Sequence, residues 1–155
     1  MAMTAALMMS GSVAQAQDVN IGRSNITLTS DLMTPETLWA MGRIGAAQAS
    51  PDGKKIVYQV GYYSVKENKG HQVLRVMDAD GKNDHLLTTS AKSEGDAAWL
   101  DNNTLAFLTG GQLWTMNADG TNRKQLTHSD IDIEGFRFSP DRKRVVLIKS
   151  IPYYG

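Results

Sequence analysis

The sequence of 155 residues contains no cysteine. This absence excludes a disulfide framework, a catalytic thiol and a thiolate metal site. There is no run of about 18 apolar residues, so the sequence predicts no membrane-spanning helix. An excess of charge is also lacking, because 16 Lys and Arg residues balance 16 Asp and Glu residues. Proteins that bind nucleic acid usually show a basic excess, so we expect no nucleic-acid partner.

The first 16 residues have the character of a targeting segment. They are apolar and small, and they end in Ala14-Gln15-Ala16, which has the small-x-small pattern of a signal-peptidase site. A positively charged start is missing, and a buried N-terminal helix is the alternative. Gly11, Ser12 and the polar shift at Gln17 weigh against that helix. We therefore predict a signal peptide over residues 1–16, a polar linker over residues 17–31, and export to the periplasm or beyond the cell.

An internal repeat is the strongest pattern in the sequence. Val76–Thr88 aligns without a gap with Thr115–Thr127, and Met77 and Met116 set the offset (116 − 77 = 39). A period near 40 occurs in propeller blades and also in some helical repeats. Both copies contain Asp-Gly, which favours a hairpin because glycine takes a positive φ without a Cβ clash. The repeat therefore predicts strand, turn and strand.

A second turn pattern precedes each copy of the repeat. Ser50–Gly53 reads Ser-Pro-Asp-Gly, Ser139–Arg142 reads Ser-Pro-Asp-Arg, and Asp101–Asn103 is a degenerate version. Proline presets φ at the first central position and glycine supplies the left-handed position. Arg142 stands where Gly53 does, at a cost of about 1 kcal/mol if it is left-handed.

These turns divide one period into four short strands, near residues 95–100, 104–109, 112–117 and 123–127, as in a propeller blade. We predict an all-β fold, a β-propeller of four-stranded antiparallel blades of which about two and a half are present. The blades are expected within residues 45–155, at about 46–88, 95–127 and an incomplete 133–155, with a longer excursion at 61–71. A short helix is expected over residues 32–44, with Thr34 as its N-cap and Pro35 at its first position.

The repeats resemble those of a known family. Ser50–Tyr58 and Leu113–Thr127 look like the propeller repeats of TolB and of prolyl-oligopeptidase-family serine peptidases. The segment Leu32–Trp39 and the excursion around Val65–Lys69 are similar to exported bacterial dipeptidyl-peptidases of that family, of the type called dipeptidyl-peptidase five. The likeness covers residues 32–155. It implies a propeller that gates and positions peptide substrates for a C-terminal α/β-hydrolase domain with a Ser-His-Asp triad.

No catalytic residue can be assigned within this sequence. The Gly-x-Ser-x-Gly nucleophile motif of such hydrolases is absent, so we expect the catalytic domain to lie outside this chain and leave open whether this segment is itself an enzyme. His85 and His128 fit turn or edge positions. Asp78–Asp84 lacks the spacing of a calcium loop, and no cofactor or metal is expected. A TolB-like propeller that binds protein partners and a cell-surface interaction module remain as alternatives.

Two acidic residues are candidates for substrate binding. Glu94 and Glu134 each enter a predicted strand. The family resemblance implies that acidic groups of the propeller hold the amino terminus of the substrate, and a carboxylate offers charge-assisted hydrogen bonds to an ammonium group. The simpler interpretation is that both are solvated loop charges. Open strand edges in a partial propeller also predict poor solubility or a homodimer formed through an edge.

Overall fold

The computed structural model describes residues 21–23, 27 and 31–153. The predicted signal peptide over residues 1–16 and most of the predicted linker lie outside these residues. The elements, in chain order, are α1 (Pro35–Ala40), β1 (Arg43–Ala49), β2 (Lys55–Ser64), β3 (Lys69–Asp78), β4 (His85–Leu86), β5 (Glu94–Trp99), β6 (Thr104–Thr109), β7 (Gln112–Asn117), β8 (Lys124–Gln125), β9 (Gly135–Phe138) and β10 (Val145–Ile148). Over the described parts of the chain, no helix has the length and apolar character needed to cross a membrane.

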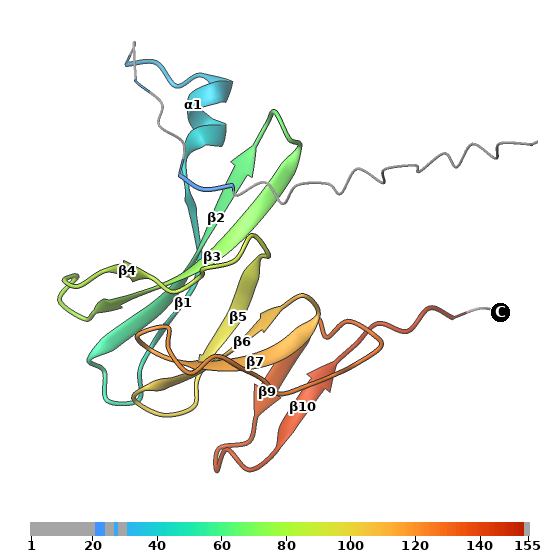
Figure 1. Cartoon of the computed structure of the whole chain (residues 1–155). Helices are drawn as coiled ribbons and strands as arrows, with labels where there is room; N and C mark the ends of the chain where they lie inside the picture. Colours follow the sequence, from blue (N-terminus) through green and yellow to red (C-terminus); the bar gives the residue numbers. More distant parts are fainter. Residues whose placement is uncertain (1–20, 24–26, 28–30, 154–155) are drawn as a thin grey trace, which may run out of the picture.

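The strands form two four-stranded sheets and one pair (Figure 1). The first sheet has the order β1-β2-β3-β4, the second has the order β5-β6-β7-β8, and β9 pairs with β10. All neighbours are antiparallel. The prediction of four-stranded antiparallel sheets is therefore confirmed. β5, β6 and β7 lie within one residue of the predicted strands, whereas β8 is only two residues long.

The repeat in the sequence is also a repeat of hydrogen bonds. In the first sheet the Asp78 N–H donates to the Lys82 carbonyl at 2.8 Å, and in the second sheet the Asn117 N–H donates to the Thr121 carbonyl at 2.8 Å. Both turns contain a glycine with φ of +83°. This left-handed conformation is the physical reason for Asp-Gly in both copies.

The Ser-Pro-Asp turns close in the same way. The Ser50 N–H donates to the Lys55 carbonyl at 2.8 Å, and the Ser139 N–H donates to the Arg144 carbonyl at 2.9 Å. Gly53 has φ of +70° and Arg142 has φ of +59°. Arg142 thus adopts the left-handed conformation that the sequence comparison with Gly53 predicts.

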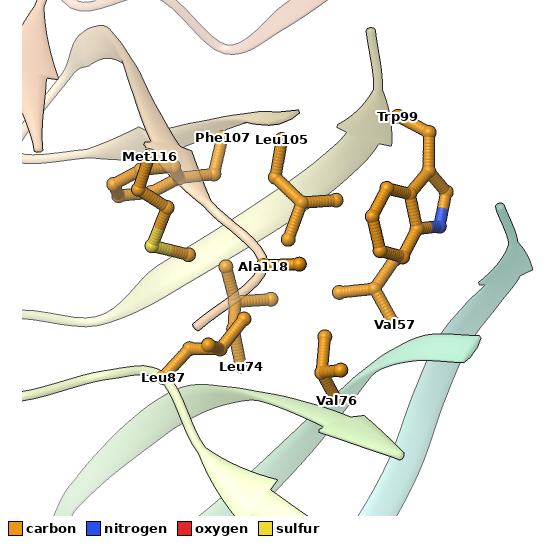
Figure 2. Packing of buried hydrophobic residues seen from close by; sticks show 9 residues of the cluster. All are labelled: Val57, Leu74, Val76, Leu87, Trp99, Leu105, Phe107, Met116 and Ala118. Atoms are coloured by element: carbon orange, nitrogen blue, oxygen red, sulfur yellow. The ribbon is translucent and has the colours of Figure 1, made fainter. Parts of the chain in front are cut away.

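The second sheet lies between the other two units. One hydrophobic cluster joins the first sheet to the second, with Val57, Leu74 and Val76 facing side chains that include Leu105 and Phe107 (Figure 2). A second cluster joins the opposite face of the second sheet to the β9–β10 pair, and its buried members are Ala106, Leu113, Ile133 and Phe136. The three units are therefore stacked face to face through apolar side chains that alternate along each strand.

The helix is shorter than expected. The Thr34 hydroxyl accepts a hydrogen bond from the Thr37 N–H at 3.2 Å, so the predicted N-cap is present. The helix ends at Ala40 because Met41 is extended, with φ of −72° and ψ of 134°, and β1 already begins at Arg43. The expected range of 32–44 was too long. None of the six described helical residues is buried, so the helix lies on the surface at the end of the first sheet.

The β2–β3 hairpin is longer than its counterpart in the second sheet. β2 and β3 each have 10 residues, whereas β6 and β7 each have 6. The additional residues correspond to the predicted excursion at 61–71. They continue as a regular ladder, with Gly61 opposite Gln72 and Tyr63 opposite Gly70. The hairpin therefore projects past the second sheet, beside α1 (Figure 1).

Candidate functional site

Glu94 lies at the start of β5 and is fully buried between the first and second sheets, with an exposed fraction of 0%. One carboxylate oxygen accepts from the Arg123 guanidinium. The other accepts from the Thr88 hydroxyl at 2.9 Å. The same hydroxyl accepts from the Leu74 N–H at 2.8 Å, so the carboxylate is tied to the backbone of β3. Both oxygens of Glu94 are thus engaged inside the protein.

Arg123 is held by several groups besides Glu94. Its Nη1 donates to the Leu87 carbonyl at 3.3 Å, and its guanidinium carbon lies 4.9 Å from the centroid of the Phe107 ring. Its side chain is 23% exposed. A buried ion pair is tolerated only when further hydrogen bonds satisfy the charged groups, and this pair meets that condition.

The electrostatics of Glu94 reflect its burial. Burial raises the pKa of the Glu94 carboxyl above its usual value, while Arg123, Thr88 and the charge of His71 oppose the rise. A substrate ammonium group could reach this carboxylate only if Arg123 moved away. The role of Glu94 in substrate binding stays a prediction, and in this conformation the residue acts as a structural link between sheets.

Glu134, the other candidate, lies on the surface just before β9. Its carboxylate accepts from the Ser150 hydroxyl at 2.7 Å, and its backbone N–H donates to the Ile148 carbonyl at 2.9 Å. By the repeat offset it occupies the position of Gly95 in β5 (134 − 95 = 39). Glu134 is accessible to a ligand, and its predicted role is likewise untested. Glu94 thus binds Arg123 and Thr88, whereas Glu134 binds Ser150.

The histidines of the first sheet bind backbone carbonyl groups. The Nδ1 of His71 lies 2.6 Å from the Ile21 carbonyl and its Nε2 lies 3.3 Å from the Lys92 carbonyl. His85 contacts the Asn83 carbonyl at 2.8 Å in the same manner. These contacts indicate that both imidazoles have a structural function.

A polar groove opens near the start of β5. We call it the glutamine groove; it has a volume of about 350 Å³, and its lining includes Gln59, Gln72, Ser93, Gly95, Asp96 and Thr109. Gly95 lies close to both glutamine side chains. A Cβ at this position would lie 3.0 Å from Gln59 Oε1 and 3.3 Å from Gln72 Oε1. Side-chain amides both donate and accept hydrogen bonds, so the groove suits a ligand with main-chain amide groups.

Asp96 is an exposed carboxylate on this groove, and its backbone is unusual. It has φ of +51° and lies where the β5–β6 register shifts, between Gly95 and Ala98. Such bulges re-aim side chains and are frequent beside binding sites. Within the acidic stretch Glu94–Asp96 the sequence predicted Glu94 as the candidate for substrate binding, but the accessible carboxylate is that of Asp96. The glycine inside a predicted strand was the available signal, because it often marks a bulge.

No protein-family model matches this chain. Two curated relatives match most of its length. Dipeptidyl-peptidase 5 of Porphyromonas endodontalis is 35% identical over 130 residues, which cover 81% of this chain and 19% of that protein. Dipeptidyl-peptidase 5 of Porphyromonas gingivalis is 40% identical over 132 residues, covering 82% of this chain and 19% of that protein. The chain thus spans about a fifth of the length of these relatives.

Solved structures share the fold of this chain at low sequence identity. The acylaminoacyl peptidase of Pyrococcus horikoshii matches 72% of this chain and 18% of its own, with a TM-score of 0.56 and 12% identity. An oligogalacturonate lyase in complex with manganese matches 71% of this chain and 35% of its own, with a TM-score of 0.55 and 19% identity. At these identities the likeness concerns the fold alone. The curated relatives are peptidases by name, so the comparisons do not favour the TolB-like alternative.

Proposed function

We propose that this chain is the N-terminal propeller part of an exported serine peptidase of the prolyl-oligopeptidase family, of the dipeptidyl-peptidase type. The observation that carries the proposal is the 35% and 40% identity to two proteins named dipeptidyl-peptidase 5, across about four fifths of this chain. In the proposal, an α/β-hydrolase domain elsewhere in the whole protein supplies the catalytic serine. The chain described here supplies substrate selection.

The stacked sheets support the propeller in this proposal. The first and second sheets have the same strand order, and β9 and β10 form an antiparallel hairpin as β5 and β6 do. The pair Phe138–Val145 corresponds to the pair Trp99–Leu105, at offsets of 39 and 40 residues (138 − 99 = 39; 145 − 105 = 40). Four-stranded antiparallel sheets that repeat near this period and pack face to face are typical of propeller blades. We therefore assign the two sheets as neighbouring blades and the β9–β10 pair as part of a third.

The glutamine groove supports a role in gating and positioning the peptide. Its amides suit the main chain of a peptide, and the carboxylate of Asp96 suits an amino terminus. Glu134 is the accessible member of the two carboxylates predicted from the sequence, because Glu94 is paired with Arg123. We propose that Asp96 and Glu134 draw the substrate ammonium group toward this end of the propeller.

Export is the remaining part of the proposal, and it rests on the Ala14-Gln15-Ala16 pattern. N-terminal sequencing of the protein recovered from the periplasm or culture medium is the direct test. A mature chain that begins at Gln17 supports export. A chain recovered from the cytoplasm with residues 1–16 intact contradicts it.

The peptidase proposal is tested on the complete protein encoded by the gene. We expect a fluorophosphonate probe to label one serine, and peptides with a free amino terminus to release dipeptides. The same peptides with an acetylated amino terminus are the matched control and should not be cleaved, because they lack the ammonium group. Absence of both labelling and dipeptide release would contradict the proposal.

A further inference from the structure

The projecting part of the β2–β3 hairpin borders a second, open hollow. We call it the tryptophan pocket; it has a volume of about 340 Å³, and its lining includes Trp39, Arg43, Gly61, Tyr63 and Gly70. In the second sheet the corresponding hairpin turns back at Gly110–Gly111, before it could form such a wall. The pocket is therefore a product of the excursion that interrupts the repeat.

Arg43 brings a permanent positive charge to this pocket, which His71 also lines. Its guanidinium carbon lies 4.7 Å from the centroid of the Trp39 ring, and its Nη2 donates to the Leu38 carbonyl at 3.4 Å. Arg43 takes part in none of the ion pairs found among the described residues. A guanidinium has five N–H donors in a planar fork that matches a carboxylate, so donors remain for a ligand.

Two walls of the pocket are aromatic. The rings of Trp39 and Tyr63 lie 4.9 Å apart at an angle of 42°. The Tyr63 hydroxyl donates to the side-chain oxygen of Asn68 in the β2–β3 turn. Trp39 is nevertheless 41% exposed, which is unusual for a side chain of this size. A partly exposed aromatic side chain beside a guanidinium suits a ligand with an apolar group next to an anion.

Two glycines keep the pocket open. A Cβ at Gly61 would meet only the Arg43 carbonyl oxygen, at 3.9 Å. A Cβ at Gly70 would meet the Tyr62 carbonyl oxygen at 3.7 Å and Tyr63 Cδ2 at 3.8 Å. Neither glycine has the positive φ that would demand glycine for backbone reasons. A side chain at either position would fit the strand and fill the space that a ligand needs.

We infer that Trp39, Arg43 and Tyr63 form a binding pocket for a carboxylate that adjoins an apolar group, as at the end of a short peptide. The inference rests on the proposed function only in taking the ligand to be a peptide. The tryptophan pocket and the glutamine groove share Gln72 and Ser93, so one extended peptide can occupy both. The carboxylate comes either from the peptide C-terminus or from an acidic side chain. Ligand pockets usually measure roughly 300–1,000 Å³, so this one suits a terminal residue.

The test measures peptide binding by titration calorimetry with the complete protein, treated beforehand with diisopropyl fluorophosphate so that a reactive serine cannot cleave the probe. The first pair of probes is alanyl-alanyl-phenylalanine as free acid and as C-terminal amide. The second pair is alanyl-glutamyl-alanine amide and its glutamine counterpart. We expect the carboxylate member of one pair to bind about tenfold more tightly than its neutral partner. A preference in the first pair identifies the terminal carboxylate, and one in the second pair identifies an acidic side chain.

Variants separate this pocket from general effects of charge. Arg43→Gln should abolish the preference for the carboxylate, and Arg43→Lys should retain part of it. Gly61→Val should weaken binding of the free acid and the amide alike. Arg144→Gln, in the turn between β9 and β10, removes the same charge elsewhere and should bind as the wild type does. Thermal melting checks that each variant is folded, and the two Arg43 variants decide the question if Gly61→Val does not fold.

The inference is overturned if all four peptides bind equally, or if Arg43→Gln loses no more affinity than Arg144→Gln. These outcomes are separate from failure of the proposed function. A protein that is not a serine peptidase will not react with the fluorophosphate, yet its calorimetric preference for the carboxylate can still be read.

Discussion

Arg123, just before β8, and Glu94, at the start of β5, form an ion pair in the interior of the protein, where Glu94 is completely shielded from water. The pair joins the last strand of the second sheet to its first, and the Thr88 hydroxyl extends it to the first sheet. A charged pair here takes the place that an apolar contact would fill elsewhere in the core. The ion pair therefore helps to determine how the two sheets pack against each other, and its effect on the free energy of unfolding can be measured.

Removing Arg123 should destabilise the protein strongly. Arg123→Met leaves the Glu94 carboxylate buried without its charge partner, at an expected loss of about 3–5 kcal/mol in the free energy of unfolding. The double variant Arg123→Met with Glu94→Gln should recover part of that loss. Urea denaturation measures both. Lys82→Met, which breaks the exposed pair with Asp80, is the control and should change stability by less than about 1 kcal/mol. An equal loss in the control and in Arg123→Met would refute the assignment.

Acid should weaken the first sheet through Asp84. The Arg75 guanidinium beside Asp84 holds the pKa of its carboxyl below the usual value, and the Tyr58 hydroxyl acts in the same direction. The folded protein therefore releases this proton more readily than the unfolded chain does. The stabilisation is present above the ordinary pKa of aspartate and is lost as the pH falls through the lowered value.

Asp84→Asn should accordingly be less stable at neutral pH and should lose less stability on acidification. The side chain is 38% exposed, so solvent screening limits the difference to about 1 kcal/mol or less. Denaturation curves between neutral pH and about pH 3 give the comparison, since aspartate titrates near 3.9 in unfolded chains. Arg75→Gln should flatten the curve in the same way. Parallel pH profiles for the wild type and Asp84→Asn would show that this pair does not matter.

Replacing Gly111 with alanine should destabilise the protein more than replacing Gly53 with alanine. The two have nearly the same φ, +68° and +70°, so both substitutions incur the left-handed cost of about 1–2 kcal/mol. A Cβ at Gly111 would also clash with the side chain of Asp132, whereas a Cβ at Gly53 meets nothing within 4 Å. Thermal unfolding should therefore show a larger loss for Gly111→Ala. Adding Asp132→Ala removes the two nearest atoms of that side chain and should recover most of the additional loss; the Cβ at position 132, 2.9 Å from the new Cβ, accounts for the rest. A double variant as unstable as Gly111→Ala alone is the result that argues against the contact.

Arg142→Gly should stabilise the β9–β10 pair. Arg142 has φ of +59°, and glycine removes the Cβ strain of that conformation. The gain is expected to be about 0.5–1 kcal/mol, because the added freedom of the unfolded chain offsets part of it. Arg144→Gly, two residues on, has no such strain to relieve and should not stabilise the protein. Melting temperatures of both variants provide the comparison, and equal shifts would exclude the strain explanation.

The hairpins were predictable because their causes are local. Asp80-Gly81 and Asp119-Gly120 specify their turns within a few residues, and both glycines take the expected left-handed φ. The burial of Glu94 was not predictable in this way. Glutamate is usually exposed, and the partner that makes its burial tolerable lies 29 residues further along the chain (123 − 94 = 29). Only the stacking of the sheets brings the two together.

The glutamine groove and the tryptophan pocket could not be predicted from the sequence for a similar reason. Trp39 and Arg43 come from α1 and the start of β1, while Tyr63 comes from the projecting hairpin. Each residue has an ordinary local explanation as part of a helix face or a strand. The pocket exists because the hairpin is longer than its counterpart, and the sequence showed that length only as an interruption of the repeat.

The order of the strands also has a consequence for biosynthesis. In every described sheet each strand pairs with the strand next to it in the chain. No strand of these sheets has to pair with a segment far away in the sequence. The chain entropy lost on closing each loop is therefore small, and strand pairing is fast. The first sheet can complete its hydrogen bonds while the second is still being synthesised, and its apolar face then serves as the template on which the following sheet condenses.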